Sequence, residues 1–292
     1  MTKIQIKNQL VELIDKAWEA RQGEPRPHMG ASLLGHHCDR WLWLNFRWAV
    51  IEKFEGRILR LFDRGHKEEY SAVQNLRDAG MVVTDCLDDQ KRVKFGKHVS
   101  GSLDGQVLGV PQAPKTPHLL EIKTHGVKSF KDLKAKGVKE SKWTHFVQMQ
   151  VYMHGTGLTR ALYYAVCKDN DEIYLERIVY DESIALEYIS KGQGLAMSDR
   201  MPEPCNTDPT WYLCKWCPAY TFCHQTETST EKNCRTCAFS KPEEDSTWTC
   251  GKYDQPNIPF EFQLKGCDDH ELRQDLNQWA DLKDIKGPKE VF

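Results

Sequence analysis

The alternation of helical and strand-like segments is the feature that most limits how this chain can fold. Apolar residues recur at helical spacing in three early segments, at 3–20, 39–50 and 58–79. Strand-like runs follow at 81–87, 92–96, 102–110 and 119–124. A helix near 143–155, two strands at 161–168 and 172–180, and a helix at 183–195 complete the order. This order predicts an α/β fold in which helices flank a central mixed β-sheet.

Composition narrows the class of protein further. The chain has 292 residues, and its nine Trp, eleven Phe and ten Tyr are far too many for a disordered protein. It has no run of eighteen apolar residues, and its first residues lack a signal-peptide core, so we expect a soluble cytoplasmic protein with no membrane partner. The net charge of −2 argues against a bulk polyanion binder, so any contact with nucleic acid must come from a local patch.

Three domains are expected along the chain. They are an N-terminal helix at 1–24, a main domain at 25–225 and a small metal-stapled appendage at 226–292. The last boundary depends on 224–233, which is polar and linker-like. Disulfides are rare in a reducing compartment, so the eleven cysteines are more readily interpreted as metal ligands.

A carboxylate and a lysine lie together on the strand at 119–124. Glu121 and Lys123 are two residues apart, so their side chains point to the same face. An isolated pair of this kind is usually a solvated ion pair on a surface strand. Upstream, however, Asp104 stands in a strand flanked by glycines, although Asp-Gly is also a common hairpin turn. Two carboxylates on adjacent strands beside a lysine match a Mg²⁺ or Mn²⁺ site for phosphodiester hydrolysis.

Three further residues on two helices extend this set. Glu69 falls on the stripe of its helix that should be buried, with Phe62, Gly65, Val73 and Leu76. It therefore needs a partner, either a metal ion or a buried Arg or Lys in a structural ion pair. Gln148 and Tyr152 are one helical turn apart and could donate hydrogen bonds to a phosphate or a base.

These motifs in this order resemble the PD-(D/E)XK nuclease superfamily, in its RecB-type and phage exonuclease branch. The motifs are Gly65-x-x-x-Glu69, Ser102-Leu103-Asp104-Gly105, Glu121-Ile122-Lys123 and Gln148-x-x-x-Tyr152. The resemblance covers about residues 28–225 and implies divalent-metal hydrolysis of DNA on a mixed sheet flanked by helices. Many relatives carry His where Glu69 stands, and the nearest histidine here is His66.

The resemblance also implies roles for single residues. Glu69, Asp104 and Glu121 would bind Mg²⁺ or Mn²⁺ with the Ile122 carbonyl, and Lys123 would be the catalytic lysine. Gln148 and Tyr152 would help to hold the substrate. The activity implied is that of a DNA exonuclease that resects duplex ends in phage-type recombination or repair, beside a single-strand annealing protein and within a homo-oligomer. The alternatives are a CRISPR-adaptation-like nuclease that trims DNA ends, and a non-catalytic metal-stapled module that binds nucleic acid.

Two groups of cysteines have the spacing of metal ligands. Cys214, Cys217 and Cys223 form a C-x2-C-x5-C array, for which Cys38 is an available fourth ligand. This split set looks like that of iron–sulfur nucleases related to the CRISPR-adaptation and AddB families, which implies a [4Fe-4S] cluster. Zinc in the same thiolates, or Cys38 as an ordinary buried cysteine, are the alternatives.

The second group follows the linker. It suggests a structural zinc site and consists of Cys234, Cys237, Cys250 and Cys267, with His270 as the alternative fourth ligand. The remaining cysteines have no partner pattern and are expected to pack as small apolar residues; they are Cys86, Cys167 and Cys205.

A lysine-rich stretch follows the candidate catalytic strand. Residues 123–142 contain seven lysines and two acids. Lys131, Lys134 and Lys136 would place positive charge where a phosphate backbone enters, although a solvated lysine-rich loop is an equally good interpretation.

Overall fold

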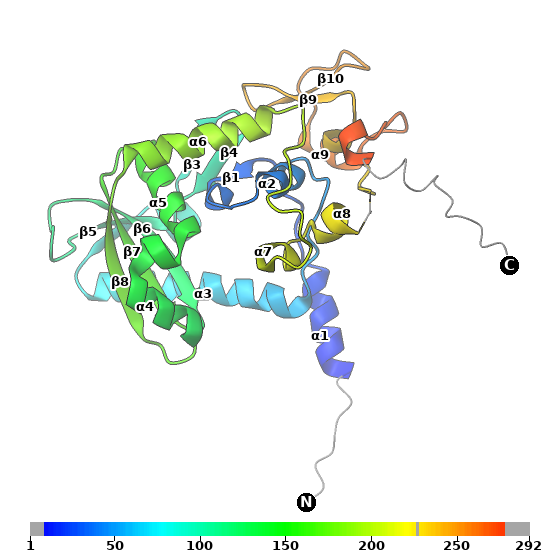
Figure 1. Cartoon of the computed structure of the whole chain (residues 1–292). Coiled ribbons are helices and arrows are strands. Elements are labelled where there is room, and N and C mark those ends of the chain that lie inside the picture. Colours follow the sequence, from blue (N-terminus) through cyan, green and yellow to red (C-terminus); the bar gives the residue numbers. More distant parts are fainter. Residues whose placement is uncertain (1–8, 226–227, 278–292) are drawn as a thin grey trace, which may run out of the picture. The chain divides into compact units, whose positions relative to one another are not determined.

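The computed structural model describes residues 9–225 and 228–277 (Figure 1). The chain forms two compact units that alternate along the sequence. The first unit comprises 1–24, 52–93 and 102–185, and the second comprises 25–51, 94–101 and 186–292. The expected division into three domains stays a prediction.

A five-stranded mixed sheet forms the centre of the first unit. Its strands lie in the order β2-β5-β6-β7-β8. Their bounds are Val82–Thr84, Gly105–Leu108, His118–His125, Arg160–Cys167 and Ile173–Val179. Strands β6 and β7 are parallel, while the other neighbours are antiparallel. The expected fold class, a mixed sheet flanked by helices, is therefore confirmed.

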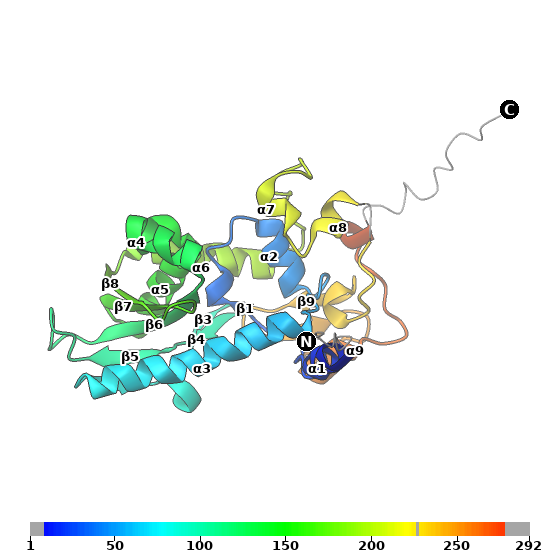
Figure 2. The same ribbon diagram turned by 90° about the horizontal axis from the view of Figure 1, so that it is seen from below.

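Helices cover both faces of this sheet. Helix α3 (Gly56–Asp78) packs against one face, and α4 (Val127–Ser141) and α5 (Trp143–Thr156) lie over the other (Figures 1 and 2). Helix α1 (Gln9–Glu19) contacts α3, where the Gly56 N–H donates to the Glu19 carboxylate at 3.0 Å. A Cβ at Gly56 would come within 2.4 Å of the Asp15 backbone, so this crossing requires glycine. The expected helix at 3–20 is confirmed from Gln9, and its first residues lie outside the described part.

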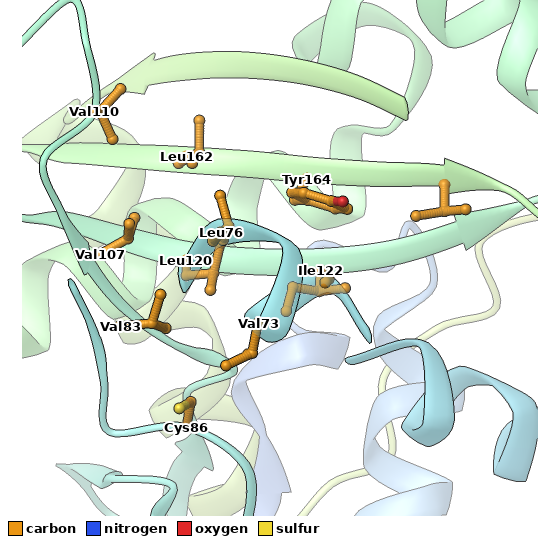
Figure 3. Packing of buried hydrophobic residues seen from close by; sticks show 12 residues of the cluster. Val73, Leu76, Val83, Cys86, Val107, Val110, Leu120, Ile122, Leu162 and Tyr164 are labelled. Carbon is orange, nitrogen blue, oxygen red and sulfur yellow. The ribbon is translucent and has the colours of Figure 1, made fainter. Parts of the chain in front are cut away.

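The core of the first unit lies between α3 and the sheet. Val73 and Leu76 of α3 face Leu120, Ile122 and other apolar side chains of β2, β5, β6 and β7 (Figure 3). These strand residues alternate with Glu121 and Lys123, as the period of two predicts. The alternation therefore directs the charged residues to the face that α4 and α5 cover.

Three local expectations were wrong in detail. The strand expected at 102–110 is divided into β4 (Val99–Ser102) and β5, and Asp104 lies in the break between them. Phe62 is 45% exposed, because only the second half of α3 reaches the core. The lysine-rich stretch is mostly the helix α4 rather than a loop, with a break at Gly137, whose φ is +74°.

The second unit is built around aromatic rings and a buried arginine. Arg235 is 1% exposed, and its guanidinium carbon lies 3.7 Å from the ring centre of Trp48 and 4.7 Å from that of Trp248. It donates to the carbonyls of Phe46 and Pro27, at 2.9 and 2.8 Å. Residues near 235 thus share one core with residues 27–48.

Short elements surround this core. The strands are β1 (Met29–Gly30), β3 (Arg92–Gly96), β4, β9 (Ser240–Pro242) and β10 (Trp248–Cys250). The helices are α2 (Asp39–Phe46), α6 (Glu182–Met197), α7 (Tyr212–Lys215), α8 (Tyr220–His224) and α9 (Phe260–Lys265). The expected cap of α6 is present, since the Ile184 N–H donates to Asp181 at 3.3 Å. Within the described ranges, no helix has both the length and the apolar character needed to cross a bilayer.

Removing the Leu120 side chain should destabilise the first unit strongly. Leu120 is 0% exposed, so Leu120→Ala should lower the free energy of unfolding by about 2–5 kcal/mol through lost burial and an unfilled cavity. Leu108→Ala is the matched control, because Leu108 on neighbouring β5 is 39% exposed and should lose much less. Urea denaturation measures both variants, and equal losses would contradict the placement of the core.

Candidate active site

The centre of the candidate site is a buried ion pair on β6. Glu121 is 0% exposed, and Lys123 forms an ion pair with its carboxylate. The Lys123 ammonium also lies 3.6 Å from Asp104 Oδ2 and donates to the Ile122 carbonyl at 3.2 Å. The structure therefore brings together the lysine and the two strand carboxylates that the sequence singles out.

Asp104 is held in place by the strand beside it. It lies in the break between β4 and β5, and its Oδ2 accepts a hydrogen bond from the Ile122 N–H at 2.8 Å. A Cβ at Gly105 would approach Cys86 Cβ to 3.1 Å and the Thr84 carbonyl to 3.2 Å. Glycine therefore permits the close approach of the segment 84–86. The break thus lets Asp104 turn towards β6 instead of continuing the strand.

Glu69 approaches this group from α3. Burial and the Asp104 carboxylate raise the pKa of Glu69, while His66 and Lys123 act in the opposite direction. Its carboxylate lies 3.6 Å from His66 Nδ1, and Gln90 donates to it at 3.5 Å. The helix carboxylate therefore belongs to the same charged group, and His66 lies beside it rather than in its place.

Burial dominates the electrostatics of the pair. Burial raises the pKa of Glu121 to about 8, although the Lys123 ammonium acts to lower it. The pKa of Lys123 is raised by Glu121 and Asp104 despite burial, so the ammonium stays charged. The Lys123 ammonium is thus shared by the Glu121 and Asp104 carboxylates, and it also helps to lower the pKa of Glu69.

Across the described residues, no three His, Cys, Asp or Glu side chains lie at the mutual distances of a single-ion site. Around Glu121 the Lys123 ammonium lies against the carboxylates that a metal ion would use. The donor set, three carboxylates and a carbonyl, consists of the hard oxygens that Mg²⁺ and Mn²⁺ prefer. A bound ion would require Lys123 to move aside.

The residues expected to hold the substrate are mostly buried or already paired with acids. Gln148 and Tyr152 lie on α5 but are only 5% and 2% exposed. On α4, Lys134 forms an ion pair with Glu172 at 3.1 Å and Lys136 one with Asp132 at 2.7 Å. Part of the positive charge of this helix is therefore neutralised, and the roles of these residues stay predictions.

A chain of four polar side chains beside Lys123 was missed by the sequence reasoning. The Tyr163 hydroxyl lies 2.9 Å from His125 Nε2 and 2.8 Å from His145 Nδ1. The other ring nitrogen of His125 lies 3.1 Å from the Ser129 hydroxyl. Strand alternation from Lys123 could have indicated His125, but Tyr163 lies opposite Glu121 only through the pairing of β6 with β7.

The four cysteines expected to hold a cluster line one small cavity in the second unit. The cavity has a volume of about 20 Å³ and includes Cys38, Cys214, Cys217 and Cys223 in its wall. Burial and three of these thiols raise the pKa of Cys217 to about 11. The fold therefore brings these four thiols to one cavity, although no three of them lie at single-ion distances among the described residues, and their iron–sulfur or zinc ligation stays a prediction.

Cys205 also lies in this cavity, which the sequence did not indicate. The residue is exposed overall, but partial burial of its thiol and the neighbouring thiols of Cys38 and Cys214 raise the pKa of Cys205. The expectation that it packs as a small apolar residue was wrong, whereas Cys86 and Cys167 are buried. Cys205 is far from the other cysteines in sequence and has no spacing motif, so only the fold brings it there.

The second cysteine group is also gathered by the fold. Burial and the thiols of Cys237, Cys267 and Cys250 raise the pKa of Cys234 to about 11. The alternative ligand His270 uses Nε2 in a contact with the Thr236 hydroxyl at 3.0 Å. Zinc binding by this group, with Cys267 as the fourth ligand or His270 as the alternative, stays a prediction.

Comparison with known proteins adds distant likenesses only. No protein-family model and no curated protein matches the chain. The crystal structure of SSO0001 matches at 16% identity and a TM-score of 0.43, over 73% of this chain and 95% of that one. LHK-Exo, an alkaline exonuclease from Laribacter hongkongensis, matches at 18% identity and a TM-score of 0.39, over 62% of this chain and 90% of that one. Its complex with dAMP matches at 17% identity and a TM-score of 0.40, with the same coverage. Likenesses this distant assign no activity to the chain.

Metal binding at this site should depend on pH. Because burial raises the pKa of Glu121 to about 8, protons compete increasingly with a divalent ion for this carboxylate as the pH falls below that value. We expect the apparent affinity for Mn²⁺ to rise from pH 6 to about 8, by at most about tenfold per pH unit, and then to level off. Calorimetric titration in two buffers with different ionisation enthalpies measures both the affinity and the protons released.

The matched variant for this titration is Glu121→Gln. It should bind Mn²⁺ more weakly and should lose most of the pH dependence, since the titrating carboxyl is gone. An affinity of the wild-type chain that stays constant between pH 6 and 8 would show that Glu121 is not a ligand.

Proposed function

We propose that this protein is a divalent-metal-dependent deoxyribonuclease. The observation that supports the proposal is the contact of the Lys123 ammonium with both Asp104 and Glu121, with Glu69 electrostatically coupled to Asp104 and Lys123. Three acids from separate segments and one lysine are the groups that hydrolysis of a phosphodiester requires. A structural role alone would need only one carboxylate to neutralise Lys123.

Each group of the site would have a distinct task. The three carboxylates and the Ile122 carbonyl would hold Mg²⁺ or Mn²⁺, which supplies an activated water and neutralises charge on the phosphate. The Asp104 carboxylate is oriented by the Ile122 N–H, which limits its freedom. Lys123 stays protonated, so it would orient the attacking water and stabilise negative charge as it develops.

The finer parts of the proposal rest on the motifs. They are exonucleolytic resection of duplex ends in recombination or repair, action beside a single-strand annealing protein, and a cytoplasmic location. A thiolate cluster at Cys38, Cys214, Cys217 and Cys223 would close the second unit, and zinc would join Cys234, Cys237, Cys250 and Cys267.

Loss of the buried ion pair should abolish nuclease activity. Glu121→Ala/Lys123→Ala removes a metal ligand and the charged lysine, so we expect cleavage of linear duplex DNA with Mn²⁺ to fall at least about hundredfold. End-labelled linear DNA and closed circular DNA, digested side by side, measure the activity, its dependence on ends and its polarity.

The control removes an exposed lysine–carboxylate pair elsewhere. Lys97 and Glu244 are 3.0 Å apart on the surface of the second unit. Lys97 has a φ of +43°, which asparagine tolerates, so Lys97→Asn/Glu244→Ala should leave cleavage unchanged. Full activity in the Glu121/Lys123 variant would refute the catalytic assignment, and cleavage of circular DNA at the same rate would refute the exonuclease.

Metal analysis of the whole chain tests the thiolate sites. Protein purified without oxygen should be brown and hold about four iron ions per chain if the cavity binds a [4Fe-4S] cluster. Cys214→Ser should lose this iron, and Cys167→Ser should keep it, because Cys167 is buried in the first unit. Zinc in place of iron would refute the proposed iron–sulfur cluster. Retention of all zinc in Cys250→Ser would refute the proposed zinc site at the second cysteine group.

A further inference from the structure

A continuous chain of hydrogen bonds crosses the candidate site. It runs from Ser129 on α4 through His125 on β6 and Tyr163 on β7 to His145 on α5. The two inner members are buried, at 7% exposed for His125 and 0% for Tyr163, while the two ends are partly exposed. These hydrogen bonds therefore hold the ring of the partly exposed His145 through two buried partners, Tyr163 and His125.

The partly exposed end of these hydrogen bonds, His145, lies on the face of α5 that also carries Gln148 and Tyr152. His145 precedes Gln148 by three residues and Tyr152 by seven, so the three share one face of the helix. Of these three, His145 alone is partly exposed. Burial, and then the positive charge of Lys123, lowers the pKa of His145 to about 3, so the ring is neutral.

We propose that His145 contacts the DNA backbone at this site, donating its Nε2–H to a phosphate oxygen, and that Tyr163 is the positioning residue that orients its ring. The inference rests on the proposed nuclease function and adds a substrate contact to it. His145 supplies a hydrogen bond without a further charge beside Lys123.

The hydrogen-bond directions are consistent with this role. One hydroxyl can donate to only one of two imidazoles and must accept from the other. The proposal assigns Tyr163 O–H as the donor to His145 Nδ1 and His125 Nε2–H as the donor to Tyr163, with Ser129 donating to His125 Nδ1. In this arrangement both histidines are neutral, and His145 Nε2 carries the proton that a phosphate would accept.

Equilibrium binding of duplex DNA tests the contact separately from catalysis. With Ca²⁺ in place of Mn²⁺, fluorescence anisotropy should show that His145→Ala binds about five to ten times more weakly than the wild-type chain. His145→Asn, which keeps an N–H donor, should recover part of the affinity. Because His145 is neutral, the salt dependence of binding should keep its slope, whereas neutralising Lys131, Lys134 and Lys136 should flatten it.

A double-mutant cycle tests the positioning role. Tyr163→Phe keeps the ring and removes the hydroxyl, so it should weaken binding in the same direction as His145→Ala. The double variant should bind no more weakly than His145→Ala alone, because Tyr163 acts through His145. Tyr164→Phe is the matched control, since that hydroxyl bonds to Asn75 on the opposite face of the sheet and should leave binding unchanged.

The outcomes separate this inference from the proposed function. Wild-type DNA binding that His145→Ala leaves unchanged, or additive losses in the cycle, would overturn the contact and leave the nuclease proposal standing. Loss of affinity together with a lowered melting temperature in both His145→Ala and His145→Asn would show a purely structural role and would also overturn it. Absence of DNA binding by the wild-type chain would overturn both.

Discussion

The buried pair formed by Glu121 and Lys123 is the interaction on which the rest of the site depends. A carboxylate with no exposure to water is costly to ionise, and its raised pKa expresses that cost. The lysine beside it is shared with Asp104 and also acts on Glu69, which has His66 as a further partner. Such a site is stable when a positive charge is present, whether it is the ammonium or a metal ion.

Metal binding, as proposed for both units, would be coupled to the release of protons. In the first unit burial raises the pKa of Glu121 to about 8, and in the second unit burial and neighbouring thiols raise the pKa values of Cys217 and Cys234 to about 11. A metal ion must displace these protons before it gains its ligands. When no metal is bound, the raised pKa values keep the buried thiols protonated and neutral, so they place no unpaired charge inside the fold.

Several features of the site could be predicted because they depend on local rules. The period of two placed Glu121 and Lys123 on one strand face, and helical spacing directed Glu69 towards the sheet. Local rules failed where the chain turns or pairs unexpectedly. Asp104 lies in a break rather than in a strand, and most of the lysine-rich stretch is a helix in which Asp132 of the same helix and the distant Glu172 neutralise part of the charge.

By itself, the sequence determined the order of helices and strands, the mixed sheet and the faces to which the charged residues point, because periodicity and turn residues act over a few positions. Only the tertiary structure decided that Tyr163 lies opposite Glu121, that His145 reaches its hydroxyl, and that Cys205 joins the thiols of Cys38 and Cys214. These contacts depend on strand register and helix packing between segments far apart in the chain. No local pattern encodes such distances, since a shift of one residue in register would direct each side chain to the other face.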